Sequence, residues 1–432
     1  MVIVLIIQTY NQCMGTRLNI APSYLPPSTD EMASRLANVR AAMVDNYLDY
    51  FVCVDPDNIF WLTNFANFVH ERPFVLVISH VGIIQFVVPK LELPHVRTRA
   101  VGDIELIDYC EFPAPVGEEW SDSLSSLFKS NKRVGVEETC PHFIHNAIPG
   151  KIIASDAVDR CRYVKSDYEL SRIVYASNIA IDKIDRILKE AKPGQSVIQI
   201  NSNANKLTLL QLLIDQPELN ALATHVGFVI QPPSISDDPH NFTNIMGLNL
   251  EEGGPNIALV NGVMNGYGTE IERTFFLGHV PEKAKHPYAT MMEARHLAYE
   301  LCKPGNSMHE LDLAVNSHFK KAGYGENLLH RTGHSIGVTG HEGPFLAEGF
   351  HEEIQPGMLF TIEPGIYLSG VGGFRHSDTV LVTQSGNQAL TPYPDSLEDM
   401  TLPIGMLASI KFERLRMPLM RLYAKLKGLP IS

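Results

Sequence analysis

The stretch from His330 to Val380 constrains this chain most, because four clusters of glycines and polar residues follow one another within it. These clusters are Gly333-His334-Ser335-Ile336-Gly337, His341-Glu342-Gly343-Pro344, Thr361-Ile362-Glu363-Pro364-Gly365 and Arg375-His376-Ser377-Asp378-Thr379. Histidines flanked by glycine, and a glutamate that closes a short apolar strand, are typical of a site where the backbone approaches a substrate closely. We therefore predict that this stretch carries the active site.

Length and charge limit the class of protein. At 432 residues the chain exceeds what one hydrophobic core organises, so we expect two domains. The net charge of -13 argues against a nucleic-acid partner, since phosphate backbones are bound by basic surfaces. The six cysteines are scattered without a C-x-x-C pair, which predicts reduced thiols. The apolar start, Met1 to Ile7, is too short to span a membrane.

Apolar periodicity predicts how the chain is divided. We expect an N-terminal extension, an α/β domain, a second domain and a C-terminal extension, over 1–29, 30–160, 161–398 and 399–432. The first domain is predicted to have a helix at 30–50 and strands at 50–54, 74–78 and 83–88, with loops at 57–65 and 70–74. In the second we expect a long helix that ends at Pro193-Gly194, helices near 200–214, 287–302 and 308–323, and strands near 224–231, 255–261 and 271–277.

The C-terminal extension has a basic amphipathic pattern. Six basic residues and one acid lie between Ile410 and Lys427, interleaved with Phe412 and four leucines. Such a helix can lie on an anionic membrane, but more often its apolar face docks on its own domain or on a sister subunit. Pro418 interrupts the pattern, and we expect no membrane contact.

Two segments upstream supply further polar side chains. His240 lies in the polar segment 237–241, and the pattern from Val260 to Phe275 predicts a β-hairpin. Alternation along its second strand directs Glu270 and Glu272 to the same face. Three histidines and three glutamates, placed singly on different strands and loops, suit either a metal site or a proton-transfer site. Their order in the sequence does not decide between the two.

Together these motifs resemble the creatinase/prolidase/methionine aminopeptidase family. The similarity runs from about residue 30 to residue 395 and includes Lys165-Ser166, the His240 segment, the hairpin and the clusters after His330. It implies an α+β fold, with a pita-bread catalytic domain preceded by an α/β creatinase/prolidase N-terminal domain. It also implies a cytoplasmic homodimer that hydrolyses a C–N bond in a small molecule or dipeptide, similar to an Xaa-Pro dipeptidase.

The metallopeptidase branch of that family binds two divalent metals through Asp, Asp, His, Glu and Glu, as the resemblance implies. By position these ligands fall on Asn261, Glu270, His334, Glu363 and Ser377. A dinuclear site needs bridging carboxylates to hold two dications about 3.5–4 Å apart, and here an amide and a hydroxyl replace two carboxylates. We therefore expect no metal, with a single Mn, Co or Zn ion on Glu270, His334 and Glu363 as the alternative.

Creatinase, a metal-independent member of the family, is similar in several of these replacements. That resemblance implies that His240 exchanges protons as general base and acid, and that His334 polarises the scissile group. Glu272 and Glu363 would hold a cationic or amide nitrogen. His341 resembles the histidine of the peptidase branch that contacts the bound peptide.

Three further residues are candidates for substrate binding. These are Arg375, His376 and Tyr267, although strand alternation directs His376 away from the face of Ser377. Two alternatives to an Xaa-Pro dipeptidase-like hydrolase stay open. One is a creatinase-like amidinohydrolase or cyclic-amidine hydrolase. The other is a catalytically inactive pita-bread protein that binds a partner in its cleft.

Overall fold

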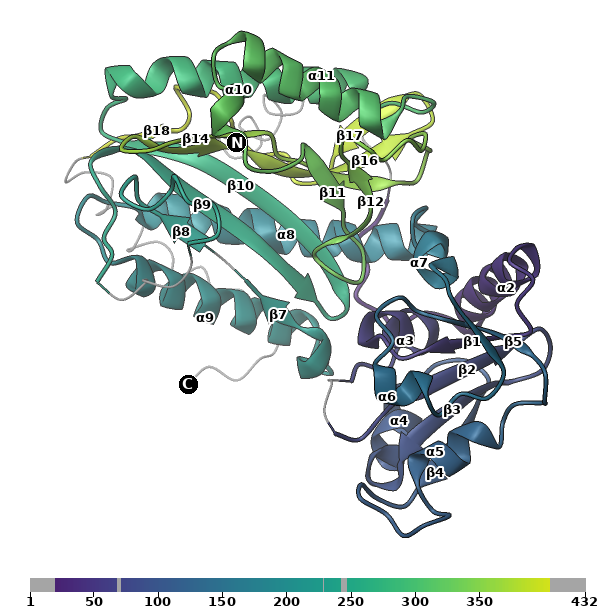
Figure 1. Cartoon of the computed structure of the whole chain (residues 1–432). Helices are drawn as coiled ribbons and strands as arrows, with labels where there is room; N and C mark the ends of the chain where they lie inside the picture. The colour runs from purple at the N-terminus through teal and green to yellow at the C-terminus, as the bar shows by residue number, and fades with distance from the viewer. Residues whose placement is uncertain (1–19, 68–70, 228, 242–246, 405–432) are drawn as a thin grey trace, which may run out of the picture.

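The structure is a computed structural model that describes residues 20–67, 71–227, 229–241 and 247–404. Two large sheets divide these residues into an N-terminal domain and a larger C-terminal domain (Figure 1). The apolar segment 1–7 and the basic segment 410–427 lie outside the described residues. Within the described part, no helix has the length and apolar character needed to cross a membrane.

The N-terminal domain is built on a six-stranded mixed sheet with the order β4-β3-β2-β1-β5-β6. Its strands are β1 (Tyr50–Cys53), β2 (Val75–Ser79), β3 (Ile84–Pro89), β4 (Ile104–Tyr109), β5 (Arg133–Val136) and β6 (Lys151–Ala154). Its helices are α2 (Thr29–Asp45), α3 (Pro56–Thr63), α4 (Leu93–Arg99), α5 (Trp120–Ser125), α6 (His142–His145) and α7 (Ala157–Cys161). The central strands β1, β2 and β3 are apolar on both faces because α2, α3 and α4 cover one face and α5 and α6 cover the other.

Most of the aromatic segment 57–65 is helical, within α3 (Pro56–Thr63), so the prediction of a loop there is wrong. Helix α3 begins after Asp55, whose Oδ1 accepts hydrogen bonds from the backbone N–H groups of Asp57 and Asn58. Pro56 stands at its first position, where no N–H is needed. Asn64 ends the helix in the left-handed conformation, with φ of 59°. Asp55, Pro56 and Asn64 together fix both ends of the helix. The prediction of a loop considered only the aromatic and charged composition of the segment.

The C-terminal domain is built on an eight-stranded sheet with the core order β13-β16-β10-β9-β7, to which β17, β18 and β8 add at β16, β10 and β9. These strands are β7 (His225–Val226), β8 (Val229–Gln231), β9 (Gly253–Met264), β10 (Tyr267–Leu277), β13 (Leu359–Ile362), β16 (Ser377–Thr383), β17 (Gly386–Ala389) and β18 (Thr401–Leu402). Two short ribbons stand beside it, β11 (Gly333–Ser335) with β12 (Glu342–Leu346), and β14 (Gly365–Leu368) with β15 (Gly372–Arg375).

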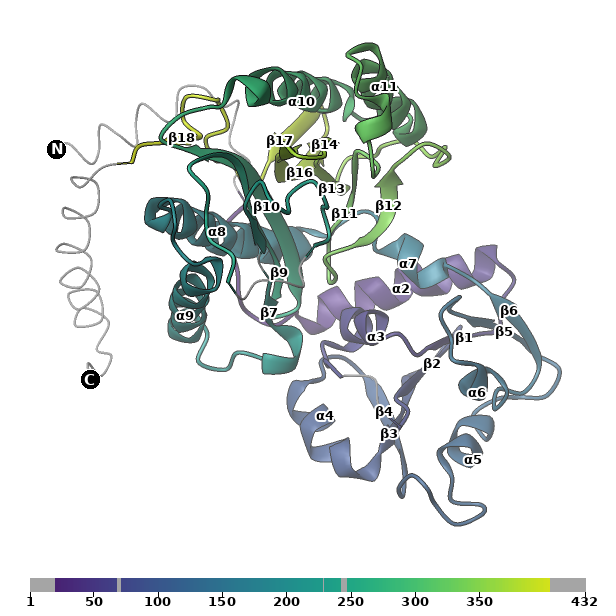
Figure 2. The same cartoon turned by 60° about the vertical axis from the view of Figure 1, so that its left-hand side comes forward.

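Four helices enclose this sheet in two pairs. They are α8 (Asp167–Glu190), α9 (Val197–Asp215), α10 (Glu282–Leu301) and α11 (Met308–Lys321). The pair α8 and α9 packs on one face and the pair α10 and α11 on the other (Figures 1 and 2). Short 3-10 helices occur at Lys90–Glu92, Ala221–Ala223 and Gly325–Asn327. The predicted long helices are therefore present, although α10 begins five residues before the expected start.

The β9–β10 hairpin is the longest feature of the sheet and confirms the predicted hairpin. Asn265 and Gly266 form its two-residue turn, with φ values of 52° and 95°. Gly266 lies so close to the ring of Phe60 that a Cβ there would clash with it. The tip of the hairpin therefore packs on α3 of the N-terminal domain, while its middle lies inside the C-terminal domain.

Candidate active site

Two glutamates enter the site from β10. Glu270 pairs with Asn261 on β9, and Glu272 pairs with Leu259 on the same strand. Both side chains are buried. On the other side, Ser377 begins β16 opposite Glu272, and its Oγ donates a hydrogen bond of 2.7 Å to Glu270 Oε1. One carboxylate oxygen of Glu270 thus already accepts a hydrogen bond, from the hydroxyl of Ser377.

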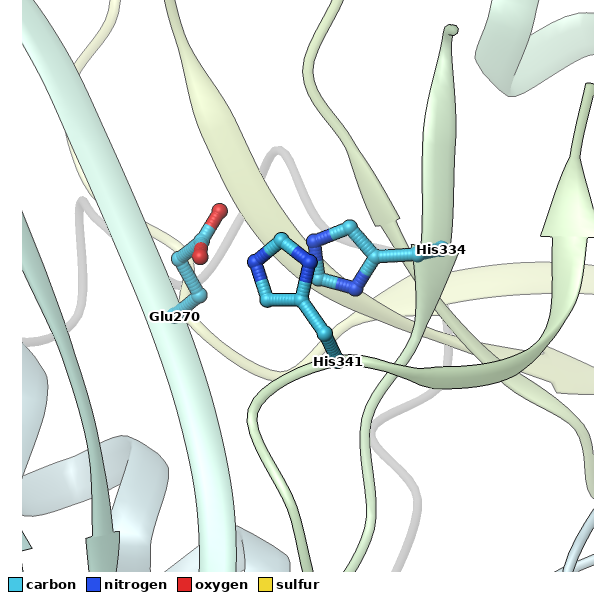
Figure 3. A group of neighbouring side chains, drawn as sticks. All are labelled: Glu270, His334 and His341. Atoms are coloured by element: carbon cyan, nitrogen blue, oxygen red, sulfur yellow. The ribbon is translucent and has the colours of Figure 1, made fainter. Parts of the chain in front are cut away.

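His334 enters from β11, which lies against β13. A Cβ at Gly333 would clash with the carbonyl of Thr361, so glycine is required for this close approach. His334 Nδ1 lies 3.0 Å from the carbonyl oxygen of Ser335, to which it donates. This contact leaves Nε2 as the atom that faces the cluster. The ring of His341 stacks on His334 with centroids 3.8 Å apart and the carboxylate of Glu270 close by (Figure 3).

Glu363 follows β13 and faces His334. Its Oε1 lies 3.2 Å from His334 Nε2 and accepts a hydrogen bond of 3.1 Å from Thr361 Oγ1. Burial lowers the pKa of His334, but the carboxylates of Glu363 and Glu270 outweigh burial and raise this pKa above its ordinary value. Burial acts to raise the pKa of Glu363, but His334 holds this pKa well below its usual range. The two residues therefore form a buried ion pair.

Arg375, from β15, neutralises Glu272. Arg375 Nε donates to Glu272 Oε1 at 2.6 Å, and Nη1 lies 3.3 Å from the hydroxyl of Tyr367. Burial raises the pKa of Glu272, and Arg375 opposes this rise. The hydroxyl of Tyr367 also lies 2.6 Å from His330 Nε2. A continuous polar chain thus runs from Glu272 through Arg375 and Tyr367 to His330.

Two further predicted histidines are His341 and His240. Burial, together with the charge of the neighbouring His334, lowers the pKa of His341 to about 4, so His341 is neutral at pH 7. His240 is exposed at the end of the segment 231–241. The carbonyl oxygen of the preceding residue, Pro239, lies 3.5 Å from Arg375 Nη1, so this segment borders the cluster.

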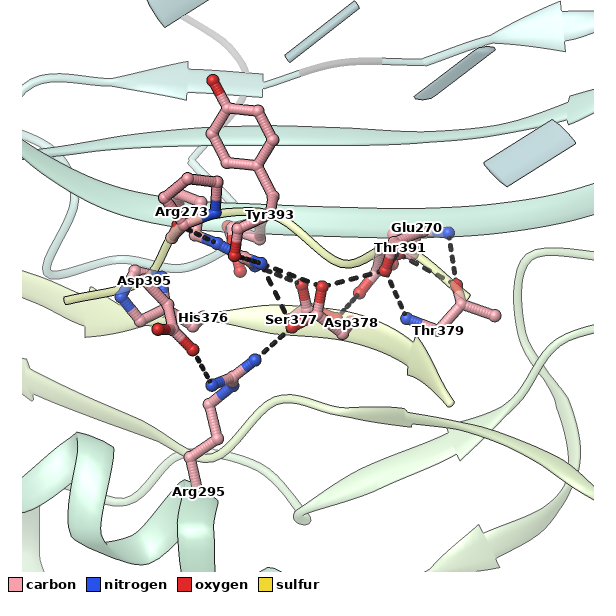
Figure 4. A network of polar contacts seen from close by, with 12 residues as sticks. Glu270, Arg273, Arg295, His376, Ser377, Asp378, Thr379, Thr391, Tyr393 and Asp395 are labelled. Atoms are coloured by element: carbon pink, nitrogen blue, oxygen red, sulfur yellow. Dashed lines mark hydrogen bonds and ion pairs between the residues drawn. The ribbon is translucent and has the colours of Figure 1, made fainter. Parts of the chain in front are cut away.

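Two predicted substrate-binding residues do not join the cluster. His376 Nε2 lies 2.9 Å from the hydroxyl of Tyr288, on the side of the strand that holds Arg273 and Arg295 (Figure 4). Alternation along the chain places Ser377 and His376 on opposite faces. Tyr267 is buried at the domain junction, where its hydroxyl accepts a 2.9 Å hydrogen bond from Arg35. Both side chains thus have partners outside the cluster, and a substrate contact of either residue stays an untested prediction.

The residues fit one metal ion better than two. Glu270, His334 and His341 offer ligand atoms within 4.8 Å of one another, and His334 Nε2 is a buried nitrogen without a well-directed hydrogen bond. This group differs from the expected one, in which Glu363 was the third ligand. A second ion would need carboxylates where Asn261 and Ser377 stand. The donor set therefore does not fit a dinuclear centre.

Sequence reasoning missed three residues that line the cluster. Tyr367 and His330 belong to the polar chain described above, and Arg331 precedes β11, with its guanidinium carbon 4.4 Å from the ring centroid of Phe345. These side chains meet because β11 and the β14–β15 ribbon converge on β10. All three lie within the stretch from His330 to Val380 that is predicted to carry the site, but no spacing in it pairs any of them with the cluster.

Comparison with known proteins identifies the family. Residues 35–164 match the creatinase/prolidase N-terminal domain, and residues 171–384 match metallopeptidase family M24. The peptidase YqhT of Bacillus subtilis is 30% identical over 274 residues, which cover 62% of this chain and 74% of that protein. The chain belongs to metallopeptidase family M24.

Further M24 relatives support the fold. The Xaa-Pro dipeptidase of Pyrococcus furiosus is 24% identical over 366 residues, covering 83% of this chain and 98% of the relative. The crystal structure of the prolidase from Pyrococcus horikoshii OT3 superposes with a TM-score of 0.72 at 24% identity, covering 84% of this chain and 99% of that one. The predicted pita-bread domain with its creatinase/prolidase N-terminal domain is confirmed. The prediction of a hydrolase of the peptidase class is confirmed at the level of the family.

Proposed function

We propose that this M24 chain hydrolyses a C–N bond in a small substrate, the kind of reaction for which its Xaa-Pro dipeptidase relative is named. We further propose that the reaction proceeds by proton transfer without a dinuclear metal centre. The observation that carries the proposal is the hydrogen bond from Ser377 Oγ to Glu270 Oε1. It supports a site in which a hydroxyl stands where a bridging carboxylate would be needed. Asn261, opposite Glu270, supports the same conclusion.

The charged pairs of the site assign the roles. Water adds its hydroxyl to the scissile carbon, the C–N bond breaks, and the leaving nitrogen gains the proton that the water lost. His240, in the segment that borders the cluster, takes the proton from water and returns it to the nitrogen. His334, held as an imidazolium by Glu363, polarises the scissile group. Glu272, held by Arg375, orients the substrate nitrogen.

A mononuclear site is the second candidate, and one observation favours it. Glu270, His334 and His341 lie close enough together to hold a single divalent ion such as Mn, Co or Zn. When bound, such an ion would polarise the scissile group and activate water. Glu363 contacts the same His334 nitrogen that would bind the ion, so it would lie beside the ion, while Glu272 and Arg375 would keep the role of orienting the substrate.

Metal analysis combined with turnover tests the proposal. The purified full chain would be assayed for bound metals, and its hydrolysis of Xaa-Pro dipeptides, creatine and cyclic amidines would be measured before and after chelation. Turnover that survives chelation supports proton transfer without metal. Turnover that depends on one ion per chain supports the mononuclear site, and two ions per chain overturn the proposal.

Histidine variants test the assigned base. His240→Ala is expected to lose most of its activity, about 100- to 10,000-fold, while it stays folded. His142→Ala is the matched control, because His142 is exposed in the N-terminal domain. Full activity in His240→Ala would remove His240 from the mechanism.

The same substrate panel separates the remaining alternatives. Turnover of creatine or of a cyclic amidine, without turnover of dipeptides, would make the chain an amidinohydrolase. No turnover of any member would favour a binding protein that uses the cleft. A homodimer and a cytoplasmic location remain parts of the proposal, for which sedimentation velocity and cell fractionation are the measurements.

A further inference from the structure

Helix α9 is apolar on two sides. Its buried side packs against α8 and the sheet through residues that include Val197, Ile200 and Leu212. On the other side, four apolar side chains are between 39% and 49% exposed. We call these four the α9 patch: Ile198, Leu209, Leu210 and Leu213. At about 3.6 residues per turn they lie within about one third of the helix circumference. A helix that is apolar all round is normally covered on both sides, so we expect the α9 patch to have an occupant.

The described chain ends close to the start of α9. Ile404, the last described residue, lies against Gly278 at the end of β10. The end of β10 pairs with the start of β9. Leu248 and Leu250, which lead into β9, form backbone hydrogen bonds with residues 194–197, where α9 begins. The residues that follow Ile404 therefore leave the domain at the end where α9 starts.

The length of α9 matches that of the basic segment 410–427, which lies outside the described residues. From its start, α9 runs towards the N-terminal domain, where Arg99 Nη1 donates to the carbonyl of Glu218 at 3.0 Å. Its 19 residues span about 28 Å, and the segment 410–427 would span about 27 Å as a helix. The intervening residues 405–409 can reach over up to about 17 Å. The segment can therefore reach the start of α9 and lie along its whole length.

The apolar residues of the segment have the spacing of a helix-packing seam. They recur at alternating intervals of three and four, and they are Phe412, Leu415, Leu419, Leu422 and Leu426. This is the heptad spacing of a helix that packs lengthwise on another helix. The spacing continues in phase across Pro418, so one apolar edge runs through the segment.

Charge and tethering favour an occupant from the same chain. The segment has six basic residues and one acid on a chain of net charge -13, so the rest of the chain is strongly acidic and attracts it. Lys206 and Asp215 are the only charged residues of α9, so covering the α9 patch desolvates little charge. The short connection 405–409 also keeps the segment at a high effective concentration near its own α9.

We propose that the segment 410–427 docks along α9 of its own chain and covers the α9 patch with its heptad-spaced apolar residues. The α9 patch is then a contact within one chain, and neither a second copy nor a membrane is its occupant. The docking does not depend on the proposed reaction.

Limited trypsin digestion of the full chain tests the docking. The six basic residues of the segment are cleavage sites, and cleavage of a docked segment follows the fraction of chains in which it has detached. The double variant Leu210→Gln, Leu213→Gln is expected to be cut between residues 411 and 427 at least about tenfold faster than the wild-type chain, because it loses apolar contact area. Ile83→Gln, at an exposed residue of the N-terminal domain, is the matched control. Circular dichroism verifies that each chain is folded, and mass spectrometry identifies the cleaved bonds.

Chemical cross-linking identifies the surface on which the segment lies. In the full chain, Leu210→Cys combined with Leu422→Cys is expected to be linked within one chain by a short bismaleimide. Ile83→Cys combined with Leu422→Cys is the control and should give no such link. Mass spectrometry of the digest separates these links from those of the native cysteines.

Each other result would overturn the proposal. Equal cleavage rates for the wild-type chain and the double variant, or equal linking of the two cysteine pairs, would remove α9 as the docking surface. Links between two chains, or cleavage that slows as the protein concentration rises, would assign the α9 patch to a second copy. Protection from trypsin that appears only with phosphatidylserine vesicles would assign the segment to an anionic membrane.

Discussion

Replacement of Glu342 by Gln tests a buried charge cluster of one carboxylate and two cations. The carboxylate of Glu342 accepts from Arg162 Nη2 and Lys165 Nζ, and the three side chains are 7%, 6% and 1% exposed. Arg162 Nη1 also donates to Asn58 Oδ1 at 2.8 Å in the N-terminal domain. Glu342→Gln would remove the counter-charge that two buried cations share and leave Arg162 only the more distant carboxylate of Asp159, at 3.6 Å. Glu342 directly follows His341 of the site.

The cost follows from burial of all three groups. Removing one partner of a buried ion pair costs about 3–5 kcal/mol of unfolding free energy. In a unit of this size each kcal/mol lowers Tm by about 2 °C, so the expected fall is about 6–10 °C. Glu282→Gln should leave Tm unchanged, because Glu282 pairs with Lys285 at the surface and is 88% exposed.

Thermal unfolding followed by near-ultraviolet circular dichroism measures this difference. Both variants would be compared with the wild-type chain in the same buffer and at the same protein concentration. The reasoning would be refuted by a loss of less than about 1 kcal/mol for Glu342→Gln, since that is the range of an exposed pair. The reasoning would also be refuted if Glu342→Gln and Glu282→Gln lowered the free energy of unfolding by the same amount.

Two further predictions concern the carboxylates of the site. Burial raises the pKa of the Glu270 carboxyl group from its ordinary value of 4.5 to about 8. Between these two pH values the folded chain keeps a proton that the unfolded chain has lost. The free energy of unfolding therefore falls as the pH rises above 4.5. Glu270→Gln should therefore gain stability relative to the wild-type chain between about pH 5 and pH 8 in urea unfolding; parallel pH profiles would contradict this. The double variant Asn261→Asp, Ser377→Glu should bind two divalent ions per chain by elemental analysis, whereas unchanged stoichiometry would show that these positions are not the missing ligands.

Much of the fold follows from local patterns in the sequence. The apolar stripe of α8 is preceded by Ser166, whose hydroxyl and the carboxylate of Glu169 form a capping box, and both signals are local. The hairpin likewise follows from alternation and from Asn265-Gly266. Helix α3 was missed because its aromatic residues gave no helical period, although Asp55 and Pro56 mark its start.

The candidate site was only partly predictable, for a physical reason. Glu270 and Glu272 share a face by strand alternation, which needs no knowledge of the rest of the fold. The contact of Tyr367 with His330, and the stack of Arg331 on Phe345, depend on how separate ribbons converge. Such contacts are set by tertiary packing, which no spacing within one segment encodes.

The tight fit of the hairpin tip couples its length to the neighbouring domain. The backbone N–H of Gly266 donates to Ala223, the carbonyl of Asn265 accepts from Arg172, and the ring of Phe60 closes the remaining space. Lengthening this turn would push it into α3, so insertions here require a compensating change in the N-terminal domain. In evolution the hairpin turn and α3 must therefore vary together. The number of residues between Asn261 and Glu270 is accordingly tied to how the two domains pack on each other.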